Sequence, residues 1–214
     1  MKLIKHAHAC VEIDAGLGSL LVDPGTFTAD ASELLTHATA VLITHEHFDH
    51  LDADALDAAL ARRPELPVWG PAAAIGRWAD TYPDRVHEVR AGDTFVAAGL
   101  TVQVHGESHA LIHPDIPRID NVGYLIGGII YHPGDSYDVP NAEVSTLLLP
   151  VSGPWTKLAE AVDFVRAVAP DRLVQIHEVM LSETGLGSMA TFLSPDMLGP
   201  IPLTQLASGE SIEI

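Results

Sequence analysis

Cysteine is almost absent from this chain of 214 residues, which contains only Cys10. A single cysteine excludes an intrachain disulfide and a cysteine-rich structural zinc site, and we expect Cys10 to be a small, buried apolar side chain. The sequence also lacks an apolar run long enough to cross a bilayer, and its basic first residues lack the apolar core of a signal peptide. We therefore expect a cytoplasmic protein with no membrane partner.

Basic residues are scarce as well, because 11 Lys and Arg stand against 29 Asp and Glu, for a formal net charge of −18. A surface this acidic repels phosphate backbones at long range. We therefore expect a small-molecule substrate and no nucleic-acid partner, while the oligomeric state stays unknown. The length fits a single domain spanning residues 1–214, with 47% hydrophobic residues to build its core.

Histidine, by contrast, is plentiful, and the chain from Thr44 to His50 reads T-H-E-H-F-D-H. It follows Ala40 to Ile43, an aliphatic run that predicts a buried strand. The imidazoles therefore lie on a loop at the end of a strand, where they can converge. Their spacing differs from the helical H-E-x-x-H pattern. It indicates a loop around a metal ion and is compatible with two ions, since one tetrahedral ion could not easily use all four ligands.

Three more ligand-type side chains, His109, Asp135 and His177, follow predicted strands further along the chain. Ligands gathered from strand ends are held by a rigid sheet. Imidazole and carboxylate groups suit Zn²⁺, Mn²⁺ or Fe²⁺, with Zn²⁺ as our first expectation.

The H-x-H-x-D-H motif and the order of the later ligands resemble those of the metallo-β-lactamase-fold hydrolases. That resemblance implies an αββα sandwich of two mixed β-sheets flanked by helices, with two divalent metal ions. It further implies that one ion is held by His45, His47 and His109 and the other by Asp49, His50 and His177, with Asp135 between them. Tyr131 to Asp135, Y-H-P-G-D, most resembles the branch that contains L-ascorbate-6-phosphate lactonase, which favours a lactone or a sugar-phosphate-like substrate.

These features predict a binuclear metal-dependent hydrolase in which metal-bound hydroxide attacks an ester, lactone or phosphoester of a small molecule. We expect Asp49 to orient the hydroxide and His132 to act as a proton donor or to support the ligands. Three further functions stay open: a phosphodiesterase acting on lipid or nucleic acid, a thioesterase of glyoxalase II type, and a non-catalytic metal-binding protein.

Weaker expectations concern residues around the motifs. Asp23 is either a turn residue or a hydrogen-bond partner of a ligand imidazole. Residues 106–121 are expected to form a substrate loop. A pocket position and a structural position both stay open for His8 and His113, and an anion-binding role stays open for Arg118 or Lys157. We expect packing for Trp155 and solvated carboxylates for Glu107 and Glu178. We also expect surface positions for His6, His37 and His87, and a core or sheet-edge position for His105.

The hydrophobic pattern predicts alternating strands and helices in two similar halves. The expected helices cover residues 52–63, 71–80 and 157–168. The expected strands cover residues 3–14, 20–22, 40–44, 68–69, 86–89, 94–97, 100–105, 122–126, 128–132, 144–149 and 171–174. The stretch from Ser182 to Pro202 is rich in Gly, Pro, Ser and Met and is expected to be irregular.

Overall fold

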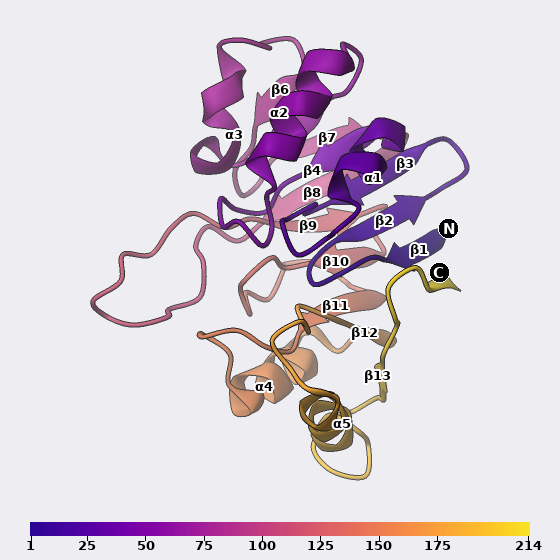
Figure 1. Ribbon diagram of the computed structural model, residues 1–214. Helices are drawn as coiled ribbons and strands as arrows, with labels where there is room; N and C mark the ends of the chain where they lie inside the picture. The colour runs from indigo at the N-terminus through magenta and orange to yellow at the C-terminus, as the bar shows by residue number, and fades with distance from the viewer.

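The computed structural model describes residues 1–214 and contains two sheets of seven strands each (Figure 1). The first sheet has the order β14-β1-β2-β3-β4-β5-β6. Its strands are β1 (Lys2–Lys5), β2 (Val11–Asp14), β3 (Ser19–Val22), β4 (Ala40–Leu42), β5 (Val68–Gly70), β6 (Val86–Glu88) and β14 (Ser211–Glu213). Pairing is antiparallel from β14 to β3 and parallel from β3 to β6.

The second sheet has the order β13-β12-β11-β10-β9-β8-β7 and the same mixture of directions. Its strands are β7 (Thr94–Ala97), β8 (Leu100–His105), β9 (Gly123–Ile126), β10 (Ile130–His132), β11 (Thr146–Pro150), β12 (Arg172–Ile176) and β13 (Leu203–Thr204). Pairing is antiparallel from β7 to β10 and parallel from β10 to β13.

Three hydrophobic clusters define four layers, because apolar side chains fill the space between the sheets and both outer faces. The central cluster joins the sheets through residues such as Leu20 and Leu42 from one and Tyr124 and Val174 from the other. The outer face of the first sheet packs against α1 (Ala31–His37), α2 (Ala53–Arg62) and α3 (Ala72–Ala79). The outer face of the second packs against α4 (Leu158–Val168) and α5 (Glu183–Phe192). This αββα sandwich confirms the predicted fold class.

Two predictions of local structure were wrong. Residues 3–14 form a hairpin and not one continuous strand, because the chain turns at His6 to Cys10, where the Cys10 N–H donates to the Ala7 carbonyl. The stretch from Ser182 to Pro202 is not irregular throughout, because α5 occupies its first half. The Ser182 hydroxyl accepts a hydrogen bond from the Gly185 N–H, and Met189 packs against the core, which together outweigh the glycines.

Three short elements were not predicted: α1, β13 and β14. All are too short for a clear period, and their positions are fixed by packing and pairing with distant parts of the chain. The three predicted helices are confirmed within one or two residues at each end. None of the helices has both the length and the apolar character that a membrane span requires.

Candidate metal centre

The site is assembled where several strands end at one edge of the sandwich. β4 leads into the T-H-E-H-F-D-H loop, β8 leads toward His109, β10 toward Asp135 and β12 directly into His177. These strands all run in the same direction within their sheets, so their carboxyl ends meet at one edge. Side chains far apart in sequence are thereby delivered to one place.

The seven predicted ligands lie together in two adjoining groups. The ligand atoms within each group are within 4.8 Å of one another, and His8 joins one of the groups. The groups are His45, His47, His109 and Asp135, and His8, Asp49, His50 and His177. All of these side chains are buried except His47, which is half-buried.

Asp135 connects the two groups through its two carboxylate oxygens. Its Oδ1 lies 3.0 Å from His50 Nε2 and 3.1 Å from His177 Nε2, both in one group. Its Oδ2 lies 3.3 Å from His109 Nε2 in the other group and accepts a hydrogen bond of 2.9 Å from the Trp155 indole. The carboxylate thus occupies the position between the two groups that a bridging ligand requires.

Hydrogen bonds turn the ligand imidazoles toward the centre. His50 Nδ1 lies 2.7 Å from Asp23 Oδ2, and His109 Nδ1 donates to the Ala110 carbonyl at 2.6 Å. The Thr44 hydroxyl lies 3.0 Å from His45 Nδ1 and donates to Asp23 at 2.7 Å. In each of these histidines the Nδ1 is held by protein, so Nε2 is the nitrogen that can bind a ligand.

The donor set fits divalent metal ions. The Nε2 atoms of His50, His109 and His177 and the Oδ1 of Asp135 are buried without a hydrogen-bond partner. Orphaned buried polar atoms are costly and rare in native proteins. Their concentration in one place is explained if they coordinate metal ions that satisfy them.

Charges in the centre shift several pKa values in the metal-free protein. Burial alone would raise the pKa of Asp135, but His50 and His177 outweigh it and hold the pKa well below its usual range. Burial alone would lower the pKa of His50, but Asp135 and Asp23 outweigh it and raise the pKa well above the usual value. For His45, burial dominates and lowers the pKa well below the usual value, which keeps this imidazole neutral.

Asp23 has the role of a hydrogen-bond partner of a ligand imidazole. It is fully buried, with φ of 50°, and its carboxylate also accepts from the Thr44 N–H at 2.8 Å. A left-handed backbone at a non-glycine residue is strained and persists only where its surroundings fix it. Here the contacts with Thr44 and His50 fix it.

His8 belongs to the centre, although its sequence position in the first hairpin gave only a weak indication. Its Nε2 lies 3.1 Å from Asp49 Oδ2, its ring centroid lies 3.7 Å from that of His177, and its Nδ1 is buried without a partner. His8 and His177 both have positive φ, and the His177 N–H donates to the His8 carbonyl. The turn after β1 and the end of β12 therefore hold each other.

His132, which we expect to donate a proton or to support the ligands, is enclosed by the protein. It is fully buried, its Nε2 lies 2.9 Å from the Ala9 carbonyl, and its Nδ1 accepts from the Gly134 N–H at 3.1 Å. Both ring nitrogens are used within the protein, so proton donation by His132 would require one of these bonds to break.

The weaker expectations divide between correct and wrong. Glu178 is not a solvated carboxylate, because it pairs at 2.9 Å with Lys5, whose side chain is fully buried. Trp155 packs as expected but also holds Asp135, a contact that no local sequence signal predicts. His6 is buried and not on the surface, while His37 is exposed as predicted. His113 is exposed and pairs with Asp115 instead of lining the centre.

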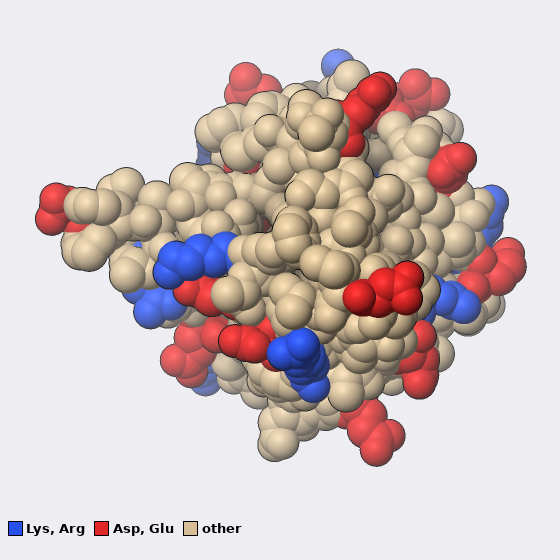
Figure 2. Space-filling model, turned by 90° about the horizontal axis from the view of Figure 1, so that it is seen from below, with Lys and Arg blue, Asp and Glu red and all other residues tan.

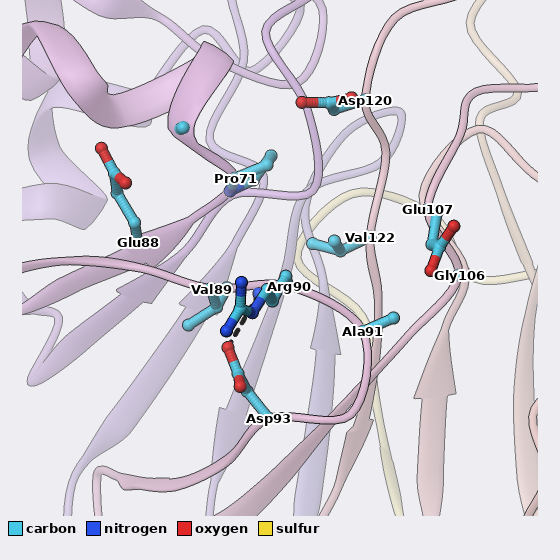
Figure 3. A pocket seen from close by; sticks show the side chains of 11 residues that line it. Pro71, Glu88, Val89, Arg90, Ala91, Asp93, Gly106, Glu107, Asp120 and Val122 are labelled. Carbon is cyan, nitrogen blue, oxygen red and sulfur yellow. Dashed lines mark hydrogen bonds between the residues drawn. The ribbon is translucent and has the colours of Figure 1, made fainter.

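A separate hollow lies outside the metal centre, between the start of α3 and the segments that flank β7 and β9 (Figure 3). Its walls carry the carboxylates of Glu88, Asp93, Glu107 and Asp120. Its single cation is Arg90, whose backbone N–H donates to Asp93. None of the ligand residues lines it, so it adds negative charge near the site without being part of the centre.

The sequence of residues 2–177 matches the family model for the beta-lactamase superfamily domain. The chain therefore belongs to the beta-lactamase superfamily, as the fold and the ligand motif predict. It is 38% identical over 192 residues to Protein Rv0786c of Mycobacterium tuberculosis, covering 87% of this chain and 88% of that protein.

A protein of Enterococcus faecalis named UPF0173 metal-dependent hydrolase is 26% identical over 207 residues, covering 83% of this chain and 86% of that protein. Among solved structures, Igni18, a metallo hydrolase from Ignicoccus hospitalis, has a TM-score of 0.73 at 18% identity, covering 99% of this chain and 97% of that one. At that identity the likeness supports the fold alone.

Proposed function

We propose that this protein is a binuclear metal-dependent hydrolase that acts on an ester, lactone or phosphoester of a small molecule. The observation that carries the proposal is Asp135, whose two oxygens reach both ligand groups while three buried Nε2 atoms around it have no hydrogen-bond partner. The related proteins named as metal-dependent hydrolases support the same reaction class.

Two divalent ions would be held by the two groups, with Asp135 shared between them. Such ions supply Lewis-acid activation of water and stabilise negative charge on the substrate's carbonyl or phosphoryl oxygen. Zn²⁺ is the first choice for imidazole and carboxylate ligands, followed by Mn²⁺ and Fe²⁺.

The residues of the chain position the reactants. Asp49 stays ionised, because His8 and His50 outweigh the effect of burial and hold its pKa below the usual value. Its carboxylate can therefore accept a hydrogen bond from the attacking water and orient it. The water oxygen bonds to the acyl carbon or the phosphorus, the bond from that atom to the leaving oxygen breaks, and the leaving oxygen takes up the proton that the water gives up.

No side-chain nucleophile is needed. The sequence has no G-x-S-x-G elbow, and burial raises the pKa of the Cys10 thiol, which leaves it unreactive. The net charge of −18 favours a small molecule over a nucleic-acid substrate. The likeness of residues 131–135 to the lactonase branch supports lactones as substrates.

Oxygen labelling tests the proposal. In a single turnover in heavy-oxygen water, the label should enter the acid or phosphate product directly, and a chelator should abolish turnover. Trapping of an acyl- or phosphoryl-enzyme would refute direct attack by water.

A panel of four substrate types tests the reaction class. Comparing the rates on a carboxylic ester, a lactone, a thioester and a phosphodiester separates an esterase or lactonase from a thioesterase and from a phosphodiesterase. If metal-loaded protein turned over none of the four, a non-catalytic metal-binding role would replace the proposal.

A further inference from the structure

We propose that an apolar recess beside the metal centre binds an uncharged, apolar part of the substrate. The preferred substrate would then be a carboxylic ester or lactone with a small apolar acyl group, and not a phosphorylated sugar. This inference rests on the proposed hydrolase function and specifies its substrate class.

The recess lies directly against two of the ligand imidazoles. His47 and His109 form one side, and Ile112, Ile116, Pro117 and Ile119 supply most of the rest. Its volume is about 90 Å³, well below that of a pocket for a whole drug-sized ligand. A group that lies against those imidazoles lies beside the reacting atoms, and the size of the recess limits it to a short branched chain or a single ring.

The apolar side chains come from a long loop between β8 and β9, residues 106–121, which we call the arm. The arm extends away from the body of the molecule in two perpendicular views (Figures 1 and 2). Ile116 is 48% exposed there. When an apolar group covers an exposed isoleucine, apolar surface is removed from water, which lowers the free energy. The recess is therefore expected to bind an apolar ligand group more tightly than a polar one.

The base of the arm is tied to the metal centre. The His109 N–H donates to the Ile119 carbonyl at 3.0 Å, Arg118 Nε donates to the His109 carbonyl at 3.0 Å, and Ser108 pairs with Asp120. One ligand residue and the recess are therefore parts of the same hydrogen-bonded segment. A group bound in the recess is held in a fixed relation to the metal ligands.

The charges nearby do not favour a phosphate group. Arg118 is the only cation of the recess, it is exposed, and its Nε is already bonded to the His109 carbonyl. Lys157 is 74% exposed and pairs with Glu160. The acidic hollow contributes Glu107 and Asp120 at the arm's base. A phosphate group bound in the recess, away from the metal ions, needs several converging donors or cations, and these residues do not provide them.

Binding of product-like acids tests the inference independently of turnover. Calorimetry on the metal-loaded protein would compare benzoate and isobutyrate with glucose 6-phosphate. We expect the two apolar carboxylates to bind more tightly than the phosphate. Ile112→Asn and Ile116→Asn should each weaken benzoate binding about tenfold, as loss of apolar contact does in other pockets. Ile116→Ala is a milder second variant should the polar substitutions unfold the arm.

Leu111→Asn is the matched control, because Leu111 lies on the same arm, is 51% exposed and does not line the recess. It should leave benzoate binding within about twofold, and metal content measured in each variant checks that the centre is intact. Tighter binding of glucose 6-phosphate than of benzoate, or equal effects of the Leu111 and isoleucine variants, would overturn the inference. If benzoate binding depends on the recess residues but the protein hydrolyses no substrate, the inference about the recess is supported and the proposed hydrolase function is rejected.

Discussion

Asp135 is the residue on which both halves of the metal centre depend. One of its oxygens faces His50 and His177, and the other faces His109 and is held by Trp155. In the proposed binuclear centre a terminal ligand would serve one ion, whereas a carboxylate in this position would serve two. Its loss should therefore affect the centre more than the loss of any single imidazole.

Asp135→Ala is expected to lose at least one metal ion per chain and nearly all hydrolysis. The measurement is elemental analysis after reconstitution with Zn²⁺, together with the rate on an ester substrate. His37→Ala is the control, because His37 is exposed at the end of α1 and should retain full metal content and rate. Wild-type metal content in Asp135→Ala would show that the bridge is assigned wrongly.

Asp23 contacts only one of the two ligand groups, the one that contains His50. It fixes His50 through a bond of 2.7 Å, and the amide of asparagine would weaken that bond by removing the negative charge. Asp23→Asn should lower metal affinity about 10–100-fold, the usual effect of losing such a partner. Competition with a fluorescent chelator measures the affinity, and Asp30→Asn, at an exposed position, is the control. An unchanged affinity would assign Asp23 to the turn alone.

At the scale of the elements, the first hairpin is joined to the end of β12. The Glu178 carboxylate accepts from Lys5 Nζ at 2.9 Å and from the His8 N–H at 3.2 Å, immediately after the ligand His177. Burial lowers the pKa of Lys5, although Glu178 acts in the opposite direction. The charged pair therefore places the turn that carries His8 against the metal centre.

Glu178→Ala should destabilise the protein by about 3 kcal/mol, because it leaves the buried Lys5 ammonium without a partner. Urea unfolding of the metal-free protein gives the free energy of unfolding without a contribution from metal binding. Glu183→Ala, on an exposed position of α5, should change it by less than about 0.5 kcal/mol. The double variant Lys5→Met with Glu178→Ala should recover much of the loss. If Glu178→Ala and Glu183→Ala had the same free energy of unfolding, the Lys5–Glu178 pair would have no role in stability.

At the scale of the whole molecule, the centre couples metal binding to protons and to stability. In the metal-free protein, Asp135 and Asp23 outweigh burial and raise the pKa of His50 well above its usual value, which favours the protonated imidazole. A coordinating imidazole must give up that proton. The ligand groups come together only in the folded state, so metal ions that bind them would stabilise that state by mass action.

Metal binding at pH 7 should therefore release protons, and calorimetry in buffers of different ionisation enthalpy counts them. Chelation should lower the melting temperature. Metal affinity should fall as the pH drops, and the fall should begin above the ordinary imidazole pKa of about 6.5, because the raised pKa of His50 lets its proton compete with metal at higher pH. Binding without proton release, or full metal retention at pH 4, would contradict the assignment of His50 as a ligand.

The fold class, the three longer helices and the residues that converge on the candidate metal centre can be predicted from the sequence alone. Periodicity shows in long elements such as α4, and the H-x-H-x-D-H spacing confines four ligand-type residues to one loop. Both are local signals that do not depend on distant contacts.

Which distant residues complete the centre depends instead on tertiary contacts. His8, Trp155 and Glu178 lie in turns that carry no motif, and they reach the ligands because the strands before them end at the same edge of the sandwich. The short elements α1, β13 and β14 likewise depend on partners far away in the chain. Their free energy comes from long-range pairing and burial, which no local window of sequence records.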